Sequence, residues 1–283
     1  MTKRTEHKPA VVPFQTIQAG ETRSPWWWVE PSVWTKRMLT ALETGVKGGV
    51  WFSLIDKVYA EGNLAAAFAA VAANDGAAGV DHVTTEQFAT GLPDNLKHLQ
   101  TVLQTGSYLP QAVRRVWIPK PGTHQQRLLG IPTVRDRVVQ AALRQVLEPI
   151  FERDFAEQSY GFRPGRGCQT ALARVDELLK AGYTYVVDAD LKSYFDTIPH
   201  DKLMEQLRRK VADGRVLTLI EAFLKAGILD GLEEWTPEEG SPQGSVISPL
   251  LSNIYLDPLD YRMAAKPDPR PPAEPPPLPP ASP

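Results

Sequence analysis

The chain has 283 residues, of which 42% are apolar, with a single cysteine and a formal net charge of −2 at pH 7. This length and apolar content provide for at least one sizeable core and allow two subdomains, while a single cysteine excludes an internal disulfide bond. No stretch reaches the roughly 18 uncharged apolar residues of a membrane span, and residues 1–20 are too polar for a secretory signal, so we expect a cytoplasmic protein without a membrane partner.

The N-terminal part of the sequence predicts an extension followed by helices. Residues 1–50 are expected to be an N-terminal extension that is partly disordered, but the three tryptophans at 26–28 are too apolar for a purely disordered arm and are expected to dock on the protein. Between residues 31 and 74 apolar residues recur at helical spacing, and Asn63 is expected to cap the alanine-rich helix that follows it.

A helix and a basic hairpin are expected next. Thr84 and Gln87 have the spacing of a capping box, which predicts a helix start, and Gly106 predicts the end of that helix. Apolar residues alternate along residues 112–119, a Pro-Gly turn follows, and residues 128–131 return. This segment therefore predicts an antiparallel β-hairpin.

The second half of the chain is predicted to be mostly helical. Residues 133–150 repeat apolar side chains at helical spacing and predict a buried helix. A loop with glycines and arginines at 160–167 leads into a helix with an apolar face, and two further helices are expected from 203 to 224, with a break at Asp213-Gly214. Half of the residues from 264 to 283 are prolines, which predicts a disordered tail.

Basic residues cluster in and after the hairpin. Six of them stand between positions 113 and 137 against a single acid: Arg114, Arg115, Lys120, Arg127, Arg135 and Arg137. The cluster is compatible with a surface that faces nucleic-acid phosphates, and also with a solvated helix and hairpin surface, because charged runs usually face water. Charge alone leaves both interpretations open.

Residues 185–196, which read YVVDADLKSYFD, carry the strongest chemical signal. The β-branched and aromatic run predicts a strand, whose period of two places Asp188 and Asp190 on one face. Carboxylates at a strand end suit Mg²⁺ and therefore phosphoryl or nucleotidyl transfer. Solvated strand-end acids and a sugar-nucleotide transferase are alternatives, as is an Asp-x-Asp phosphatase, although Lys192 stands where that phosphatase site favours Thr or Val.

Five segments carry more information together than any one of them alone. In chain order they are 114–122 (RRVWIPKPG), 129–140 (LGIPTVRDRVVQ), 160–167 (YGFRPGRG), 190–196 (DLKSYFD) and 240–244 (GSPQG). This ordered set resembles the motifs of the bacterial group II intron reverse transcriptases, also called intron maturases. The resemblance covers roughly residues 51–261.

The resemblance implies an α+β protein with the right-hand polymerase fold, mostly helical with a small antiparallel sheet. Residues 51–182 would form helical fingers with the basic hairpin, and residues 183–263 an incomplete palm, between the extension at 1–50 and the tail at 264–283. The implied function is that of an RNA-directed DNA polymerase, a nucleotidyltransferase that uses an RNA template such as intron RNA, a DNA primer and deoxynucleoside triphosphates.

At the catalytic site, the resemblance implies that Asp190 and the backbone carbonyl of Leu191 bind Mg²⁺. Asp188 would be a palm-strand residue outside the metal shell, or a solvated acid. Phe195 stands five positions after Asp190, where the family has an aromatic ring that packs under the incoming sugar and excludes a 2′-hydroxyl. A core phenylalanine is the alternative for Phe195.

The resemblance also implies contacts with the nucleotide and the template. Lys120 and Arg127 would reach the triphosphate, as a point charge and a bidentate fork respectively. Gln243 and Gly244 would lie near the nascent base pair, with an ordinary surface turn as the alternative. The residues implied to bind the template are Arg114, Arg115, Arg163 and Arg166.

One motif of the family is missing from the sequence. The family supplies further metal ligands from a Tyr-x-Asp-Asp hairpin beyond the Pro-Gln-Gly segment, and two-metal chemistry needs them, but this chain has no such sequence. We therefore expect a truncated reverse transcriptase that lacks the ligands of the second Mg²⁺ and has little or no DNA synthesis of its own. The alternative is a catalytically dead, maturase-like module that binds intron RNA.

Overall fold

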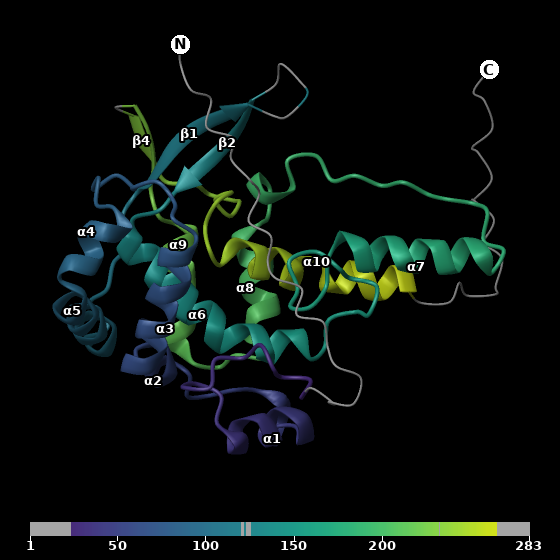
Figure 1. Ribbon diagram of the computed structural model, residues 1–283, viewed down its shortest axis with the longest axis horizontal. Helices are drawn as coiled ribbons and strands as arrows, with labels where there is room; N and C mark the ends of the chain where they lie inside the picture. Colours follow the sequence, from purple (N-terminus) through teal and green to yellow (C-terminus); the bar gives the residue numbers. More distant parts are fainter. Residues whose placement is uncertain (1–23, 120–121, 123–125, 232, 265–283) are drawn as a thin grey trace, which may run out of the picture.

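The computed structural model describes residues 24–119, 122, 126–231 and 233–264, and most of its regular structure is helical (Figure 1). The helices in chain order are α1 (Lys36–Thr44), the 3₁₀ helix η1 (Lys47–Gly49), α2 (Ile55–Val58), α3 (Glu61–Ala73), α4 (Thr85–Thr90), α5 (Leu92–Thr105), α6 (Val134–Glu152), α7 (Cys168–Lys180), the 3₁₀ helix η2 (Tyr194–Asp196), α8 (His200–Arg208), α9 (Gly214–Leu224) and α10 (Ser248–Ala264). The strands are β1 (Val113–Pro119), β2 (Gln126–Ile131), β3 (Ile228–Asp230) and β4 (Glu233–Trp235). Within the described ranges, no helix is long and apolar enough to cross a membrane.

The four strands form one small mixed sheet in the order β2-β1-β3-β4. β1 and β2 pair antiparallel, with Trp117 opposite Leu128, which confirms the predicted hairpin. β3 joins the other edge of β1 in parallel, and β4 pairs antiparallel with β3. The expectation of a purely antiparallel sheet is therefore wrong for one pairing. The chain leaving α9 reaches the free edge of β1, where the Val113 N–H donates to the Gly227 carbonyl (2.7 Å) just ahead of β3.

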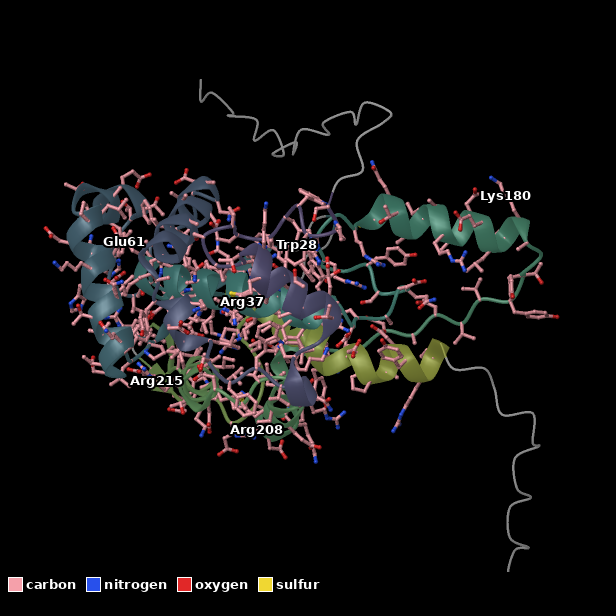
Figure 2. All side chains as sticks on the ribbon, turned by 90° about the horizontal axis from the view of Figure 1, so that it is seen from below. Trp28, Arg37, Glu61, Lys180, Arg208 and Arg215 are labelled. Atoms are coloured by element: carbon pink, nitrogen blue, oxygen red, sulfur yellow. The ribbon has the colours of Figure 1, made fainter. Side chains whose placement is uncertain are left out.

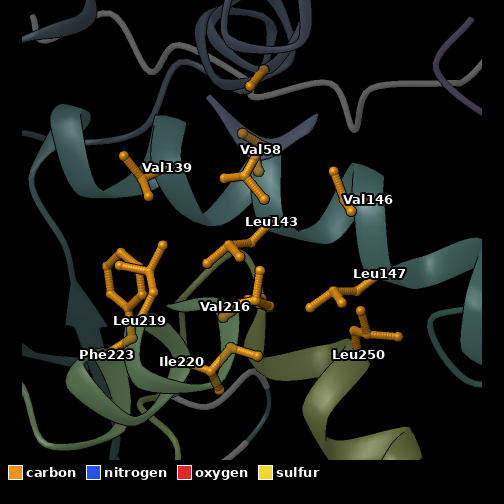
Figure 3. Close-up of a cluster of buried hydrophobic side chains, with 14 of the residues drawn as sticks. Val58, Val139, Leu143, Val146, Leu147, Val216, Leu219, Ile220, Phe223 and Leu250 are labelled. Carbon is orange, nitrogen blue, oxygen red and sulfur yellow. The ribbon is translucent and has the colours of Figure 1, made fainter. Parts of the chain in front are cut away.

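Helix α6 runs through the hydrophobic core (Figure 3). The helix starts where predicted, because the Thr133 side chain accepts a hydrogen bond from the Asp136 N–H (3.1 Å). The buried side chains in this part of the core come from α2, α6, α9 and α10 and include Val58, Leu143, Leu147, Ile220, Phe223 and Leu250. Segments from both halves of the chain thus share one core, which fixes the positions of the loops between them.

The N-terminal segment docks on this core, as the tryptophan cluster predicts. Trp26 packs against the core, and its Nε1 donates to a carboxylate of α1 (2.9 Å). Trp34 is buried, and its Nε1 donates to the Gln145 carbonyl of α6 (3.0 Å). Residues 24–50 of the extension expected at 1–50 therefore belong to the folded body, whereas its residues 1–23 lie outside the described residues, as does the proline-rich tail after residue 264.

Asn63 does not cap a helix. It lies inside α3, fully buried, and its Nδ2 donates to the carbonyls of Lys57 (3.0 Å), Val58 (3.2 Å) and Ala142 (3.2 Å). The side chain therefore joins α2, α3 and α6. The cap prediction is wrong because α3 begins two residues earlier, at Glu61, so that the amide meets tertiary acceptors instead of the free N–H groups of a helix end.

Other boundaries predicted from capping chemistry are confirmed. The Gln87 N–H donates to Thr84 Oγ1 (3.2 Å) and the Thr84 N–H donates to Gln87 Oε1 (2.9 Å), which completes the capping box of α4. Gly106 ends α5 with a left-handed φ of 74°. Asp213 caps α9, and its carboxylate also accepts from two backbone N–H groups at the start of α2 (2.7 and 2.9 Å).

Helix α7 and the segment after it project from the helical body (Figures 1 and 2). No residue of α7 is buried, and its apolar face is exposed at Leu172, Val175 and Leu179. The strand predicted at 185–188 is not formed: among the described residues no strand pairs with this segment, and Tyr185 is 98% and Val187 88% exposed. Strand propensity requires a hydrogen-bonded neighbour to take effect, and the part of the chain that the structure describes supplies no such neighbour here.

Candidate functional site

Three of the sequence motifs meet in the structure. The Gly130 N–H of β2 donates to the Gln243 carbonyl (2.6 Å), and the Ser241 N–H donates to the Phe195 carbonyl of η2 (2.7 Å). The loop 240–244 therefore lies between β2 and η2 and is bonded to both. Because these are main-chain hydrogen bonds, the relative position of the three segments is set by the backbone and not by flexible side chains.

Glycines allow the close approach of these segments. A Cβ on Gly244, which has a φ of +105°, would lie 2.5 Å from the carbonyl oxygen of Gly130. A Cβ on Gly240, which has a φ of +90°, would lie 2.8 Å from the carbonyl oxygen of Asp196. Neither position accepts a larger residue without a shift of the backbone. The two glycines in the Gly-Ser-Pro-Gln-Gly motif are thus explained by packing against β2 and η2.

Polar side chains of α6 and α10, which the sequence motifs did not single out, support the loop 240–244 and the residues that follow it. Gln140 of α6 is buried, and its Oε1 accepts from Ser245 Oγ (2.8 Å) and from the Val246 N–H (2.9 Å). At the start of α10, Ser248 Oγ donates to the Pro242 carbonyl (3.0 Å). The signal that could have revealed this support is a glutamine within the buried stretch of α6, since a buried amide is expected to have hydrogen-bond partners.

The aromatic pair of η2 is fixed by α10. The Tyr194 hydroxyl donates to the Ser252 carbonyl (2.8 Å), and its ring stacks on Tyr255 with centroids 6.3 Å apart. Burial raises the pKa of Tyr194 to about 12, so the hydroxyl remains a donor at neutral pH. Phe195 is half-buried and meets Tyr194 edge-on at 5.7 Å. Phe195 lies beside the loop that carries Gln243, as a steric gate requires, and that role stays a prediction.

A cavity of about 440 Å³ lies beside this junction. Its lining includes Arg115 from β1, Asp196 from η2, Trp235 from β4 and Ser241 from the loop. The Arg115 guanidinium lies over the Trp235 ring, 5.1 Å from its centroid, and 3.7 Å from the carboxylate of Asp230. The lining also includes the acidic residues Asp196, Glu238 and Glu239. The cavity therefore places an aromatic face next to the Ser-Pro-Gln-Gly loop, and its single arginine is already paired with a carboxylate.

The predicted metal site is not assembled among the described residues. Asp188, Asp190 and Leu191 lie on the exposed segment between α7 and η2, and no group of three or more His, Cys, Asp or Glu side chains in the described ranges could hold a metal ion. The oxygen donors of Asp190 and Leu191 suit Mg²⁺ chemically, but one carboxylate and one carbonyl do not complete its octahedral shell. The metal role of these two residues stays a prediction.

The two triphosphate contacts also stay predictions. Lys120 lies outside the described residues. For Arg127 the structure describes the backbone, which pairs with Ile118 in the hairpin, but not the side chain. Arg127 thus lies towards the far end of the hairpin, and Gln243 is bonded to its near end through Gly130.

Arg163, predicted to bind template phosphates, is part of the protein interior. Its side chain is 3% exposed, and its Nη2 donates to Glu152 Oε1 (2.8 Å). Its Nη1 donates to the carbonyls of Ala156 (2.6 Å) and Ser159 (2.9 Å), and its guanidinium lies over the Phe155 ring. The structure contradicts the template-contact prediction, because these partners leave the guanidinium no surface for a phosphate.

The other three predicted template arginines lie nearer the surface. Arg114 is half-buried and donates to the Ala78 carbonyl (2.6 Å), whereas Arg115 belongs to the cavity described above. Arg166 lies over the Tyr160 ring, 5.7 Å from its centroid, and donates to a nearby main-chain carbonyl. Template contact by these three arginines stays a prediction.

Other members of the basic cluster between 113 and 137 support the fold. Arg135 and Arg137 of α6 donate to the carbonyls of Leu109 and Ala77, each at 2.8 Å. Between them Asp136 is buried and accepts from a threonine and a tyrosine hydroxyl, and burial raises its pKa. The charge cluster of the sequence is therefore divided between interior contacts and the hairpin surface.

Comparison with known proteins agrees with the motifs. The family profile of reverse transcriptase (RNA-dependent DNA polymerase) matches residues 118–268. Protein YkfC of Escherichia coli is 45% identical over 186 residues, which cover 64% of this chain and 49% of that protein. Group II intron-encoded protein LtrA of Lactococcus lactis subsp. cremoris is 41% identical over 167 residues, or 59% of this chain and 28% of LtrA. Nuclear intron maturase 1, mitochondrial, of Arabidopsis thaliana is 35% identical over 113 residues, or 40% of this chain and 16% of that protein.

A solved structure shares the fold. A chain of the partial Cas6-RT-Cas1–Cas2 complex matches with a TM-score of 0.51 and 23% identity, over 75% of this chain and 35% of that chain. The chain spans about half the length of YkfC and less of LtrA. The profile match includes more than half of this chain, and with it the end of the hairpin, η2 and the loop 240–244. The chain thus belongs to the reverse transcriptase (RNA-dependent DNA polymerase) family, and within it to the group II intron type.

Proposed function

We propose that this chain contributes the fingers (51–182) and the first part of the palm (183–263) of an RNA-directed DNA polymerase. Its substrates are an RNA template, a DNA primer and deoxynucleoside triphosphates. The observation that carries the proposal is the junction of β2, η2 and the loop 240–244, which is held by two main-chain hydrogen bonds. This junction supports a site in which the nucleotide-facing hairpin and the base-pair-facing loop act as one unit.

The reaction is nucleotidyl transfer. The 3′ oxygen of the primer forms a bond to the α-phosphorus of the nucleotide, and the bond to the pyrophosphate leaving group breaks. Lys120 and Arg127 hold the triphosphate, Phe195 excludes a 2′-hydroxyl from the sugar position, and Gln243 lies against the nascent base pair. In this assignment the chain positions the reacting groups, which is the main contribution of the protein in such transfers.

Mg²⁺ is the metal expected for the family, with Asp190 and the Leu191 carbonyl as its oxygen ligands in this chain. When bound, the ion would neutralise charge on the phosphates. Both ligands lie on the segment that forms no strand in this structure. We propose that this segment becomes a strand only when a neighbouring strand pairs with it, and that the two ligands are brought towards the loop 240–244 at that point.

We infer that these 283 residues do not synthesise DNA on their own. Their sequence contains no Tyr-x-Asp-Asp, and the described residues offer no group of three metal-binding side chains. In a primer-extension assay with Mg²⁺, an RNA template, a DNA primer and all four deoxynucleotides, the purified protein should give no product above a protein-free reaction. Magnesium-dependent extension that the variant Asp190→Asn abolishes would show that the inference is wrong.

Nucleotide-dependent binding tests the polymerase assignment without requiring turnover. A fluorescent RNA-template–DNA-primer duplex is titrated with protein, with the next complementary or a mismatched deoxynucleotide present. A polymerase-type site should bind the duplex more tightly with the complementary nucleotide, because that nucleotide completes the base pair beside Gln243. Equal affinity with both nucleotides would contradict the polymerase assignment.

The second candidate function is an RNA-binding, maturase-like module without catalysis. It is favoured by the exposed Phe162 and the half-buried Arg166 of the loop 160–167 and by the similarity to a protein named as an intron maturase. Such a module should bind structured RNA with an affinity that falls steeply as salt rises, since phosphate contacts release counterions. It should show no response to the identity of the nucleotide in the preceding test.

A further inference from the structure

The N-terminal turn holds one tryptophan outward. The Trp27 N–H donates to the Ser24 carbonyl (3.1 Å) and the Val29 N–H donates to the Trp26 carbonyl (3.2 Å), which close a turn. Trp26 packs against the core and lies 6.1 Å from the Trp28 ring, whereas Trp27 is 54% exposed. Trp26 and Val29 both pack against the core, whereas Trp27 between them remains exposed.

Trp27 lies against the loop 160–167. Its Cζ2 atom is 3.9 Å from the position that a Cβ on Gly165 would occupy. In the same loop, Phe162 is 64% exposed and has a φ of +54°. A non-glycine residue in this region costs about 1–2 kcal/mol, and such strain is concentrated at functional sites. Trp27 thus lies against the loop that carries the exposed Phe162 ring, and the backbone is strained at Phe162.

Hydrogen bonds to the protein interior and to α10 fix the loop that carries Phe162. Arg163 binds Glu152 and two carbonyls in the interior, and Asn253 Nδ2 of α10 donates to the Gly161 carbonyl (2.8 Å). Residues on both sides of Phe162 are therefore fixed. A ring that is already positioned loses little conformational entropy when a ligand stacks on it, so little of the binding free energy is spent on ordering the ring.

The surroundings favour nucleic acid as the ligand. The segment 160–167 contains two arginines and no acidic residue, and the Arg166 guanidinium lies over Tyr160. Aromatic faces beside a cation are the features that bind single-stranded nucleic acid, because bases stack on the rings while the cation attracts the phosphates. We call Trp27, Tyr160, Phe162 and Arg166 the aromatic platform.

The aromatic platform is connected to the functional site through α10. Ser248, at the start of this helix, supports the loop 240–244, and Asn253, five residues later, supports Gly161. Because both supports come from one helix, the loop 240–244 and the loop 160–167 are held in a fixed relation to each other.

We propose that the aromatic platform binds the single-stranded part of an RNA template by stacking of bases on Trp27 and Phe162. This inference rests on the proposed function and adds base stacking to the template contact implied for the motif 160–167, with one of the two rings, Trp27, supplied by the N-terminal extension. It also assigns Arg163 a supporting role: this residue holds the loop that presents the rings.

The test is the affinity of the full chain for a fluorescein-labelled, unstructured 12-nucleotide RNA, measured by anisotropy at several salt concentrations. Trp27→Ala and Phe162→Ala should each weaken binding by about 5- to 160-fold, the effect of losing one stacked base. Neither should change the slope of log affinity against log salt, because no phosphate contact is lost. Arg166→Gln should reduce the slope by about 0.7, the value for one phosphate of a single strand. The matched control is Phe52→Ala, since Phe52 is 69% exposed on another surface and should leave the affinity unchanged.

The outcomes separate this inference from the proposed function. Affinity that is unchanged in both Trp27→Ala and Phe162→Ala, or lowered equally in Phe52→Ala, would overturn the platform and leave the polymerase assignment standing. Absence of RNA binding by the unmodified chain would overturn both. Thermal unfolding of each variant, followed by circular dichroism, checks that a loss of affinity does not result from unfolding.

Discussion

The buried Arg163–Glu152 pair allows a sharp test of the structural role of Arg163. Arg163→Met keeps the length of the side chain but removes the guanidinium, which leaves the Glu152 carboxylate (13% exposed) and two main-chain carbonyls without their donors. Removing one partner of a buried ion pair costs about 3–5 kcal/mol. For domains of this size, that corresponds to a decrease in melting temperature of about 6–20 °C.

The assay is thermal and urea unfolding of the unmodified chain and three variants. Arg166→Met is the matched control in the same loop and should cost less than about 1 kcal/mol, since Arg166 is only half-buried. Adding Glu152→Met to Arg163→Met should recover part of the lost stability, because no buried charge is then left unpaired. If Arg163→Met has unchanged stability and weaker RNA binding, the interior role is refuted and the template-contact interpretation is restored.

Two further predictions concern the loop and a helix cap. Gly244→Ala should lower the free energy of unfolding in urea by about 2–3 kcal/mol, because it combines a disfavoured φ with a Cβ 2.5 Å from the Gly130 carbonyl oxygen. The control Gly106→Ala, with a positive φ but open space, should lower it by about 1 kcal/mol. Equal losses in the two variants would refute the clash. Partial burial would raise the pKa of Asp213, but its backbone N–H donors outweigh burial and hold the pKa below the ordinary 3.8. The ionised carboxylate therefore stabilises the fold above pH 3.8. The difference in unfolding free energy between the unmodified chain and Asp213→Ala should shrink as the pH falls below that value. A difference that grows at lower pH would contradict the lowered pKa of Asp213.

The exposed segment between α7 and η2 explains why one part of the site could be predicted only in outline. The apolar run before Asp188 has the composition of a strand, and the motif around Asp190 identifies its chemistry. A strand also needs hydrogen bonds to a neighbour, and none of the described residues provides it. The composition of this segment therefore allows a β-strand, and pairing with a neighbouring strand decides whether the β-strand forms.

Arginine roles show the same division. In the sequence, Arg163 and Arg166 stand in one motif and have the same expected function. In the structure, Arg163 binds Glu152 in the interior, whereas Arg166 stays near the surface on Tyr160. The difference depends on the position of α6, which supplies Glu152, and a distant partner of this kind leaves no local pattern in the sequence.

The sequence by itself determined the features that depend on neighbouring residues. These are the capping box at Thr84, the basic hairpin, the buried helix α6 and the order of the motifs that shows the family. Each depends on chemistry within a few residues, such as a cap, a turn or a repeat of apolar side chains.

Only the tertiary structure decided which motifs meet and which side chains reach solvent. It joins Gly130, Gln243 and Phe195 by main-chain hydrogen bonds, places β3 in parallel beside β1 and turns Trp27 outward over the loop 160–167. These outcomes depend on how helices pack around a shared core, which brings together residues that are far apart in the chain. The partners of such a contact are set by the whole fold, and for that reason short-range sequence patterns do not specify them.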